Sequence, residues 1–125
     1  MTFETKVMGH RGAAKMAPEN TLAAITAAAS VGTQWVEIDV TLAADGLVIF
    51  HDATLDRCSN GTGLVKEKTL KELKSLDSGS WYSPAFVNES ILTLVEALTH
   101  IQNLGLSLNL EIKYEQDDID AIVPA

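Results

Sequence analysis

The sequence has few of the features that mark disulfide-rich or membrane-spanning proteins. It contains a single cysteine, Cys58, so no intramolecular disulfide can form, and a lone cysteine in a loop-like stretch is typical of an incidental residue. No apolar run approaches the roughly 20 residues needed to cross a bilayer, and the N-terminus lacks the basic and then apolar pattern of a secretory signal. We therefore expect a soluble, cytoplasmic chain without a transmembrane segment.

Basic residues are also scarce. The chain has 9 Lys and Arg against 17 Asp and Glu, which gives a formal net charge of −8, and its basic residues form no cluster. This charge predicts no nucleic-acid partner, and an anionic substrate would need a metal ion or a few well-placed cations. The length of 125 residues and the hydrophobic fraction of 46% fit one folded domain with its own core.

Short apolar segments rich in Val, Ile and Leu predict β-strands. They are "KVMGH", "WVEIDVTL", "LVIFHD" and "LSLNLEIK". A helix is predicted after Pro18, with Asn20 or Thr21 as its N-cap and Gly32 as its stop signal. Two more helices are predicted in "TLKELKSLDSG" and "TLVEALTHIQNLG", because each opens with a capping box.

Alternation of strands and helices predicts parallel βα units and an α/β fold. The link "AADG" before the third strand is an exception, because a parallel crossover needs about a dozen residues or more, and this shorter link favours a hairpin. The sequence leaves that choice open. Residues 53–90 form a long excursion between predicted elements, and such a span is typical of a functional loop or a small subdomain.

Acidic residues stand on the polar faces of two predicted strands. Alternation puts Glu37 and Asp39 on one face of the second strand and Glu111 on the polar face of the fourth. They could be solvated on the wet face of an open sheet, or they could hold a divalent cation. We favour a cation, Mg²⁺ or Ca²⁺, because wet-faced sheets are usually antiparallel and these ions prefer oxygen ligands.

Two histidines follow predicted strands. His10 ends the first strand and His51 the third, where a parallel architecture places its catalytic groups. Each alone could be a hydrogen-bonded structural residue, but together with carboxylates at equivalent strand ends they favour a catalytic pair. His100 lies near the end of a predicted helix and is expected to be solvated or to be favoured there by the helix dipole. The aromatic residues of "GSWYSPAF" are expected to pack the 53–90 segment, with a wall for the substrate alcohol as the alternative.

The motifs "GHRG" with "PENT", "EIDV" with "DG", "FHD" with "LDR", and "LNLEIK" together resemble the glycerophosphodiester phosphodiesterase family. They occur in the family's order with similar spacings, from about Val7 to Lys113, and the chain departs from the family at Leu92, where proline is usual. The family's fold is a (β/α)8 TIM barrel. The resemblance implies that residues 1–125 form the N-terminal half of such a barrel, with about its first four strands and an inserted subdomain or long loop at 53–90.

The resemblance also implies an activity, which is the metal-dependent hydrolysis of glycerophosphodiesters to glycerol 3-phosphate and an alcohol. The nucleophile would be the substrate's own glycerol hydroxyl, giving a cyclic phosphate before hydrolysis. Carried over residue by residue, the family's roles give metal ligands Glu37, Asp39 and Glu111, an acid/base pair of His10 and His51, and phosphate-facing Arg11 and Lys113. The sequence does not say which histidine is the acid.

Other interpretations remain. A phospholipase of the sphingomyelinase D type would share both histidines and the two carboxylates of the second strand, but "PENT" and "EIK" favour the glycerophosphodiester family. A non-catalytic binding module would lack a histidine or a metal carboxylate, and none is missing here. A TIM barrel needs about 250 residues. The chain could therefore be a fragment of a longer protein, half of a homodimer, or an inactive relative, and the helix-like "YEQDDIDAIVPA" at its end favours the first.

Overall fold

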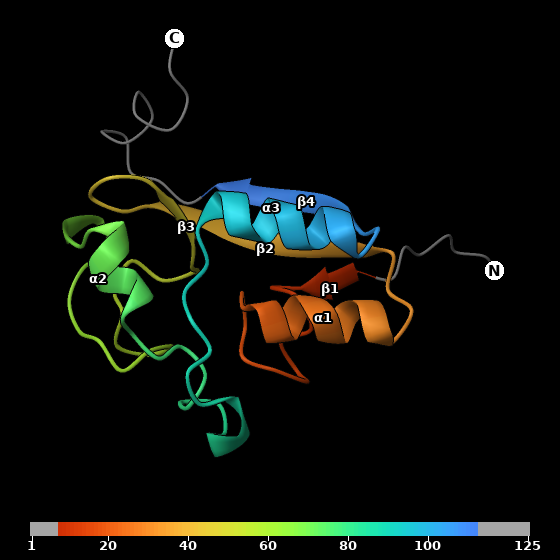
Figure 1. Ribbon diagram of the computed structural model, residues 1–125, viewed down its shortest axis with the longest axis horizontal. Coiled ribbons are helices and arrows are strands. Elements are labelled where there is room, and N and C mark those ends of the chain that lie inside the picture. The colour runs from red at the N-terminus through yellow and green to blue at the C-terminus, as the bar shows by residue number, and fades with distance from the viewer. Residues whose placement is uncertain (1–7, 113–125) are drawn as a thin grey trace, which may run out of the picture.

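A computed structural model of the chain describes residues 8–112. The elements follow in the order β1 (Met8–His10), α1 (Leu22–Ser30), β2 (Trp35–Leu42), β3 (Leu47–Ile49), η1 (Val65–Glu67), α2 (Leu70–Lys74), η2 (Pro84–Phe86), α3 (Leu94–Asn103) and β4 (Ser107–Ile112) (Figure 1). The short elements η1 and η2 are 3₁₀ helices. None of the helices in the described part of the chain has the length and apolar character needed to traverse a bilayer.

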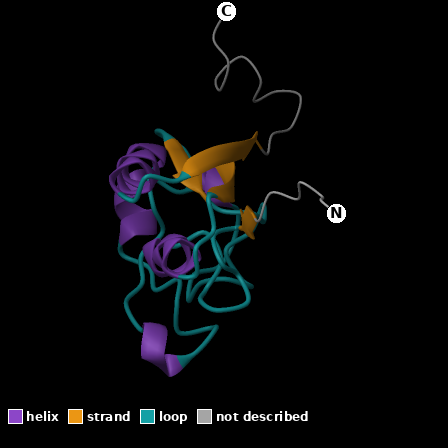
Figure 2. Ribbon diagram, turned by 90° about the vertical axis from the view of Figure 1, so that its right-hand side faces the viewer, coloured by secondary structure: helices purple, strands orange, loops and turns teal. Residues whose placement is uncertain are grey.

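Strand β2 is the centre of the sheet. Strand β1 pairs with it in parallel, with His10 opposite Glu37, and β4 pairs with it in parallel up to Val40 and Ile112. Helices α1 and α3 contact each other and pack against the strands, which lie together on one side of the molecule (Figure 2). The predicted βα alternation is therefore confirmed for β1, β2 and β4.

The third strand runs the other way. Strand β3 pairs with β2 in antiparallel register, from Val40 opposite Ile49 to Leu42 opposite Leu47. The backbone N–H of Ala43 donates to the Gly46 carbonyl at 2.8 Å and closes the turn between them. The hairpin favoured by the short link is confirmed. The parallel arrangement, which the sequence also left open, is excluded at β3, because residues 43–46 are too few to cross over a sheet.

Helix starts follow the capping signals in the sequence. Thr21 is the N-cap of α1, and its hydroxyl accepts from the backbone N–H of Ala24. The capping boxes predicted at Thr69 and Thr93 are both present. Gly32 has a φ of +83° just after α1, as a stop signal requires. Each of the threonine N-caps stabilises its helix by about 1 kcal/mol.

Two apolar clusters form the core. One lies between the sheet and helices α1 and α3, and the other lies under the 53–90 segment. Strand β3 belongs to both, because Ile49 faces the first cluster and Val48 the second. Cys58 is buried in the second cluster, and burial raises the pKa of its thiol to about 12, so the group stays neutral. The hairpin strand thus joins the 53–90 segment to the rest of the fold.

Gly12 permits the close approach of the loop after β1 to helix α1. Its φ is +75°, and a Cβ there would lie 2.7 Å from the Cβ of Ala24. We therefore expect Gly12→Ala to lower the free energy of unfolding by about 3 kcal/mol or more, since overpacking adds to the strain of the left-handed backbone.

Gly32→Ala is the matched control for this prediction. Gly32 also has a positive φ, but nothing lies within 4 Å of the added Cβ. Only the backbone strain remains, and we expect a loss of about 1 kcal/mol. Urea unfolding of the two variants compares these effects, and equal losses would contradict the packing explanation.

Candidate active site

Three carboxylates converge on one face of the sheet. Glu37 and Asp39 alternate along β2, and the parallel register places Glu111 of β4 directly opposite Asp39. One oxygen from each lies within 4.8 Å of the others. Glu37 and Asp39 are only 5% and 1% exposed, whereas Glu111 is exposed. A solvated open face is therefore the wrong explanation for the two carboxylates of β2.

The ionised form of Glu37 is unfavourable in this cluster. Its burial, together with the negative charges of Asp39 and Glu111, raises the pKa of the carboxyl to about 7. One oxygen, Oε1, accepts from the backbone N–H of Arg11 at 3.1 Å. The other, Oε2, is buried and has no hydrogen-bond partner within residues 8–112. A buried oxygen without a donor beside two further carboxylates fits a hard divalent cation such as Mg²⁺ or Ca²⁺.

Arg11 lies beside the same carboxylates. Its Nε is 3.5 Å from Oδ2 of Asp39, and its Nη1 donates to both oxygens of Glu19 at 3.3 and 3.4 Å. The residue has a φ of +54°, an uncommon backbone conformation for a side chain of this size. Lys113, the other cation expected at the phosphate, lies outside the described residues.

The two candidate histidines have different surroundings. Nε2 of His10 lies 3.5 Å from Oε1 of Glu37, and the His10 side chain is 69% exposed. His51 is 30% exposed, and its Nδ1 lies 2.7 Å from Oδ1 of Asp52. Although β3 is antiparallel, the N–H of Phe50 donates to the carbonyl of Asp39 at 3.0 Å, which puts His51 beside the carboxylate-bearing end of β2.

Comparison with known proteins identifies the family. Residues 10–123 match the family model described as the glycerophosphoryl diester phosphodiesterase family. The chain belongs to this family. The resemblance seen in the sequence motifs is therefore confirmed.

Individual relatives of this phosphodiesterase family cover much of the chain. A glycerophosphodiester phosphodiesterase of Caldanaerobacter subterraneus subsp. tengcongensis is 45% identical over 112 residues, which are 89% of this chain and 46% of that protein. Glycerophosphodiester phosphodiesterase 1 of Bos taurus is 39% identical over 109 residues, covering 85% of this chain and 33% of that protein. The chain thus spans less than half the length of these relatives.

Solved structures of the family have the same fold. A phosphodiesterase of Oleispira antarctica, in complex with the product sn-glycerol-3-phosphate, matches with a TM-score of 0.89 and 46% identity over 93% of this chain and 47% of that one. A glycerophosphodiester phosphodiesterase of Agrobacterium tumefaciens matches with a TM-score of 0.85 and 38% identity over 95% and 52% of the two chains. These relatives have TIM-barrel folds, and the sheet described here matches part of that architecture.

Three polar residues inside the family motifs, Glu19, Asn20 and Arg57, were not expected at the site. Asn20 was a candidate N-cap, but its Nδ2 donates to Oδ2 of Asp39 at 3.0 Å and its Oδ1 accepts from the Asp39 N–H at 3.2 Å. Glu19 is 8% exposed, and its carboxylate accepts hydrogen bonds from both Arg11 and Arg57. The signals for them were present in "PENT" and "LDR", strings that the sequence interpretation used only as marks of the family.

The ion pair of Asp52 predicts a dependence of stability on pH. Hydrogen bonds from Arg57, and then from His51, lower the pKa of Asp52 from 3.8 to about 2. Because the folded pKa is depressed, this stabilisation is present above the unfolded pKa and is lost as the pH falls toward about 2. We therefore expect Asp52→Asn to flatten the fall in free energy of unfolding across this pH range, as measured by urea titration.

Asp56→Asn is the control, since it removes the same charge from an exposed position close to Asp52 in the chain. It corrects the comparison for the change in net charge. A slope that is the same in Asp52→Asn and in the unaltered chain would contradict the assigned role of the Asp52 ion pair.

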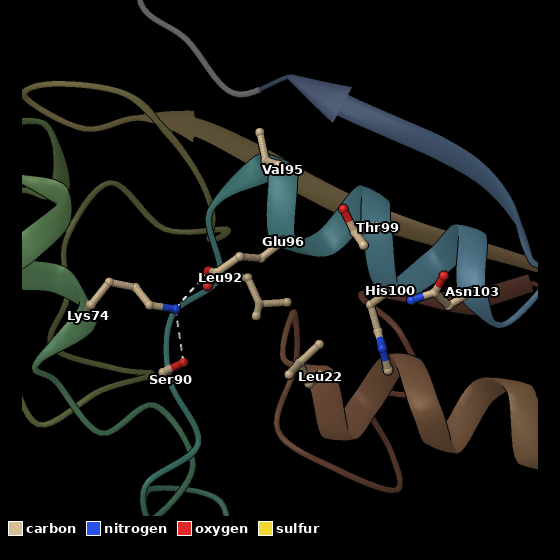
Figure 3. Close-up of a pocket in the computed structure, with 9 residues that line it drawn as sticks. All are labelled: Leu22, Lys74, Ser90, Leu92, Val95, Glu96, Thr99, His100 and Asn103. Atoms are coloured by element: carbon tan, nitrogen blue, oxygen red, sulfur yellow. Dashed lines mark hydrogen bonds and ion pairs between the residues drawn. The ribbon is translucent and has the colours of Figure 1, made fainter.

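A hollow of about 400 Å³ lies away from the carboxylates, between α3 and the start of α1 (Figure 3). The side chain of Lys74 lies at the edge of this hollow. Its Nζ donates to Oε1 of Glu96 at 2.7 Å and to Oγ of Ser90 at 3.2 Å. His100, which was expected to be solvated, lies with Nε2 2.8 Å from Oγ1 of Thr26. These contacts join helices to one another, so they give the hollow a structural explanation.

Proposed function

We propose that this chain forms the catalytic part of a metal-dependent phosphodiesterase that hydrolyses glycerophosphodiesters to glycerol 3-phosphate and an alcohol. The observation that carries the proposal is the convergence of Glu37, Asp39 and Glu111, with Arg11 and His10 beside them. Membership of the phosphodiesterase family supports the reaction class. The glycerol 3-phosphate bound by the Oleispira relative supports the identity of the product.

The three carboxylates are the proposed ligands of Mg²⁺ or Ca²⁺. When bound, such a cation supplies a Lewis acid that polarises a phosphoryl oxygen. Asn20 holds Asp39 through two hydrogen bonds, and the Arg11 N–H holds one oxygen of Glu37. These contacts fix the carboxylates before any ligand arrives, which lowers the cost of organising the site.

Arg11 is the proposed phosphate-facing cation, together with Lys113. A guanidinium presents several donors in a fixed plane, and this geometry matches a phosphate. Its Nε has no hydrogen-bond partner in the described part of the chain, although Asp39 is 3.5 Å away. Negative charge that accumulates on the phosphoryl oxygens would be stabilised by such a cation in a site with restricted access of water.

His10 and His51 are the proposed acid/base pair. One imidazole removes the proton from the substrate's glycerol hydroxyl, whose oxygen then bonds to phosphorus. The other donates a proton to the leaving alcohol as its P–O bond breaks, and water later opens the cyclic phosphate. Either assignment of the two histidines balances the protons. The contact of Nδ1 of His51 with Asp52 supports a role for Nε2 of His51 in this exchange.

The chain would form only part of a complete barrel. Residues 1–125 would be the N-terminal half of the barrel, completed by a C-terminal half or by a second copy. Residues 53–90 would be an inserted subdomain, supported by the second apolar cluster, to which the segment contributes Leu55, Cys58, Val65 and Leu73. Its aromatic residues Trp81, Tyr82 and Phe86 contact one another edge to face. These contacts favour a role in packing the segment rather than a role as a wall of the substrate site. A cytoplasmic location stays a prediction from the sequence.

The deciding experiment is the release of glycerol 3-phosphate from glycerophosphocholine by this 125-residue chain, with Mg²⁺, with Ca²⁺ and with a chelator. We expect release with at least one cation and its loss with chelator. Sedimentation of the active sample would show whether two copies complete the barrel. Folded protein that binds cation but releases no glycerol 3-phosphate would contradict the proposed activity for this chain.

A further inference from the structure

Arg57 lies in the 53–90 segment, at the end of the motif "LDR", and has no role in the proposed chemistry, yet its guanidinium contacts two carboxylates at the site. Its Nη1 and Nη2 donate to the two oxygens of Glu19, each at 3.0 Å. Its Nε and Nη2 donate to the two oxygens of Asp52 at 2.8 and 2.9 Å. One side chain therefore binds both carboxylates with paired hydrogen bonds, the strongest geometry available to arginine.

The contact with Asp52 reaches His51. Oδ1 of Asp52 lies 2.7 Å from Nδ1 of His51, and a carboxylate in this position accepts a hydrogen bond from the Nδ1–H of the ring. The neutral imidazole then carries its proton on Nδ1 and leaves Nε2 free to exchange one. Because Arg57 binds both oxygens of Asp52, the carboxylate cannot rotate without breaking charge-assisted bonds.

The contact with Glu19 reaches Arg11. Glu19 is 8% exposed and accepts from Arg11 and from Arg57 with the same two oxygens. Without Arg57, the single charge of Glu19 would pair with Arg11 alone. With Arg57 present, two cations share the single negative charge of Glu19. The positive charge of Arg11 is then less fully neutralised and attracts an anionic ligand more strongly.

The 53–90 segment holds Arg57 in place. The ring of Trp81 lies 5.9 Å from the guanidinium carbon, a cation–π contact. Next along the chain, Cys58 is buried, and its carbonyl accepts from the hydroxyl of Ser78 at 2.7 Å. The backbone around Arg57 is thus fixed by residues that do not touch the carboxylate cluster in the described structure.

We propose that Arg57 is a positioning residue, which orients His51 through Asp52 and Arg11 through Glu19, and so couples the 53–90 segment to the site. This inference rests on the proposed function for its catalytic meaning. Its structural content is separate, because the tautomer of His51 can be measured without turnover.

The test is ¹⁵N NMR of the neutral His51 ring, together with steady-state rates, for the full 125-residue chain and its Arg57→Gln variant. We expect the unaltered chain to show the Nδ1-protonated tautomer and Arg57→Gln to show a mixture of both. The turnover number of Arg57→Gln should fall roughly 10- to 100-fold, the range typical of residues that orient a ligand or base. Cation affinity should stay within about twofold, since the hydrogen bonds of Arg57 go to Glu19 and Asp52, which are not among the proposed ligands.

Two further variants make the outcome decisive. Arg57→Lys keeps the charge but not the paired hydrogen bonds, so we expect values between those of the unaltered chain and Arg57→Gln, and it serves if Arg57→Gln fails to fold. Lys71→Gln removes one positive charge from an exposed position of the same segment and should change neither measurement. An unchanged His51 tautomer in the Arg57 variants would overturn the inference. A shifted tautomer in a chain without turnover would support it while contradicting the proposed function.

Discussion

Replacing His51 with alanine should leave the fold intact and lower the rate of glycerol 3-phosphate release roughly 10²- to 10⁴-fold. The expected loss is large because a positioned acid or base contributes a factor of this size to proton transfer. The fold should persist because the His51 side chain is 30% exposed and its ring is held by a hydrogen bond with Asp52, a residue next to it in the chain. Steady-state kinetics and thermal unfolding measure the two effects, and His10→Ala should behave in the same way.

His100→Ala provides the matched control. His100 is a histidine of the same chain, but it joins α3 to α1 through Thr26. Its replacement should keep the rate and lower the free energy of unfolding by about 1 kcal/mol, the usual worth of one hydrogen bond. Full activity in either His10→Ala or His51→Ala would remove that residue from the acid/base pair.

Glu37→Gln should have two effects of opposite sign. Affinity for Mg²⁺ or Ca²⁺ should fall about 100-fold, because the variant loses a charged oxygen ligand at the centre of the carboxylate cluster. In the absence of metal, the variant should be more stable than the unaltered chain by about 1 kcal/mol or more. The reason is that Glu37 is 5% exposed and lies beside two other negative charges.

Isothermal titration with each cation and urea unfolding in chelator measure these two effects. Glu67→Gln is the control, because Glu67 is an exposed glutamate on η1, away from the cluster. It should change neither quantity. Unchanged cation binding in Glu37→Gln would rule out the carboxylates as the metal site, and a loss of metal-free stability would contradict the electrostatic account of Glu37.

The parts of the fold that were predicted correctly depend on local interactions. The helix starts at Thr69 and Thr93 follow from side chains that bond backbone groups three residues away, so short patterns suffice to find them. The direction of β3 was ambiguous because two rules conflicted. The length of the link favoured a hairpin and the barrel analogy favoured a parallel strand, and the structure follows the local rule.

The residues of the candidate site also fall into two groups, those that a local pattern predicts and those that it does not. Alternation along β2 correctly puts Glu37 and Asp39 on one face, since a strand has a fixed period of two. The roles of Asn20 and Arg57 were missed because Asp39 lies 19 residues from Asn20 and Glu19 lies 38 residues from Arg57. Asn20 reaches Asp39 from a backbone with a φ of +59°, and no local pattern around "PENT" indicates that conformation.

The 53–90 segment leaves and rejoins the fold at neighbouring points. The N–H of Ile49 donates to the carbonyl of Leu92 at 2.8 Å, and Val48 forms a β-bridge with Thr93. The segment therefore behaves as a closed loop anchored at its base, and its length can change without moving β2 or α3. In evolution, the sequence of this segment can therefore vary separately from that of the sheet. Substitutions can accumulate in it while the carboxylates stay in place, provided that an arginine still reaches Asp52 and Glu19.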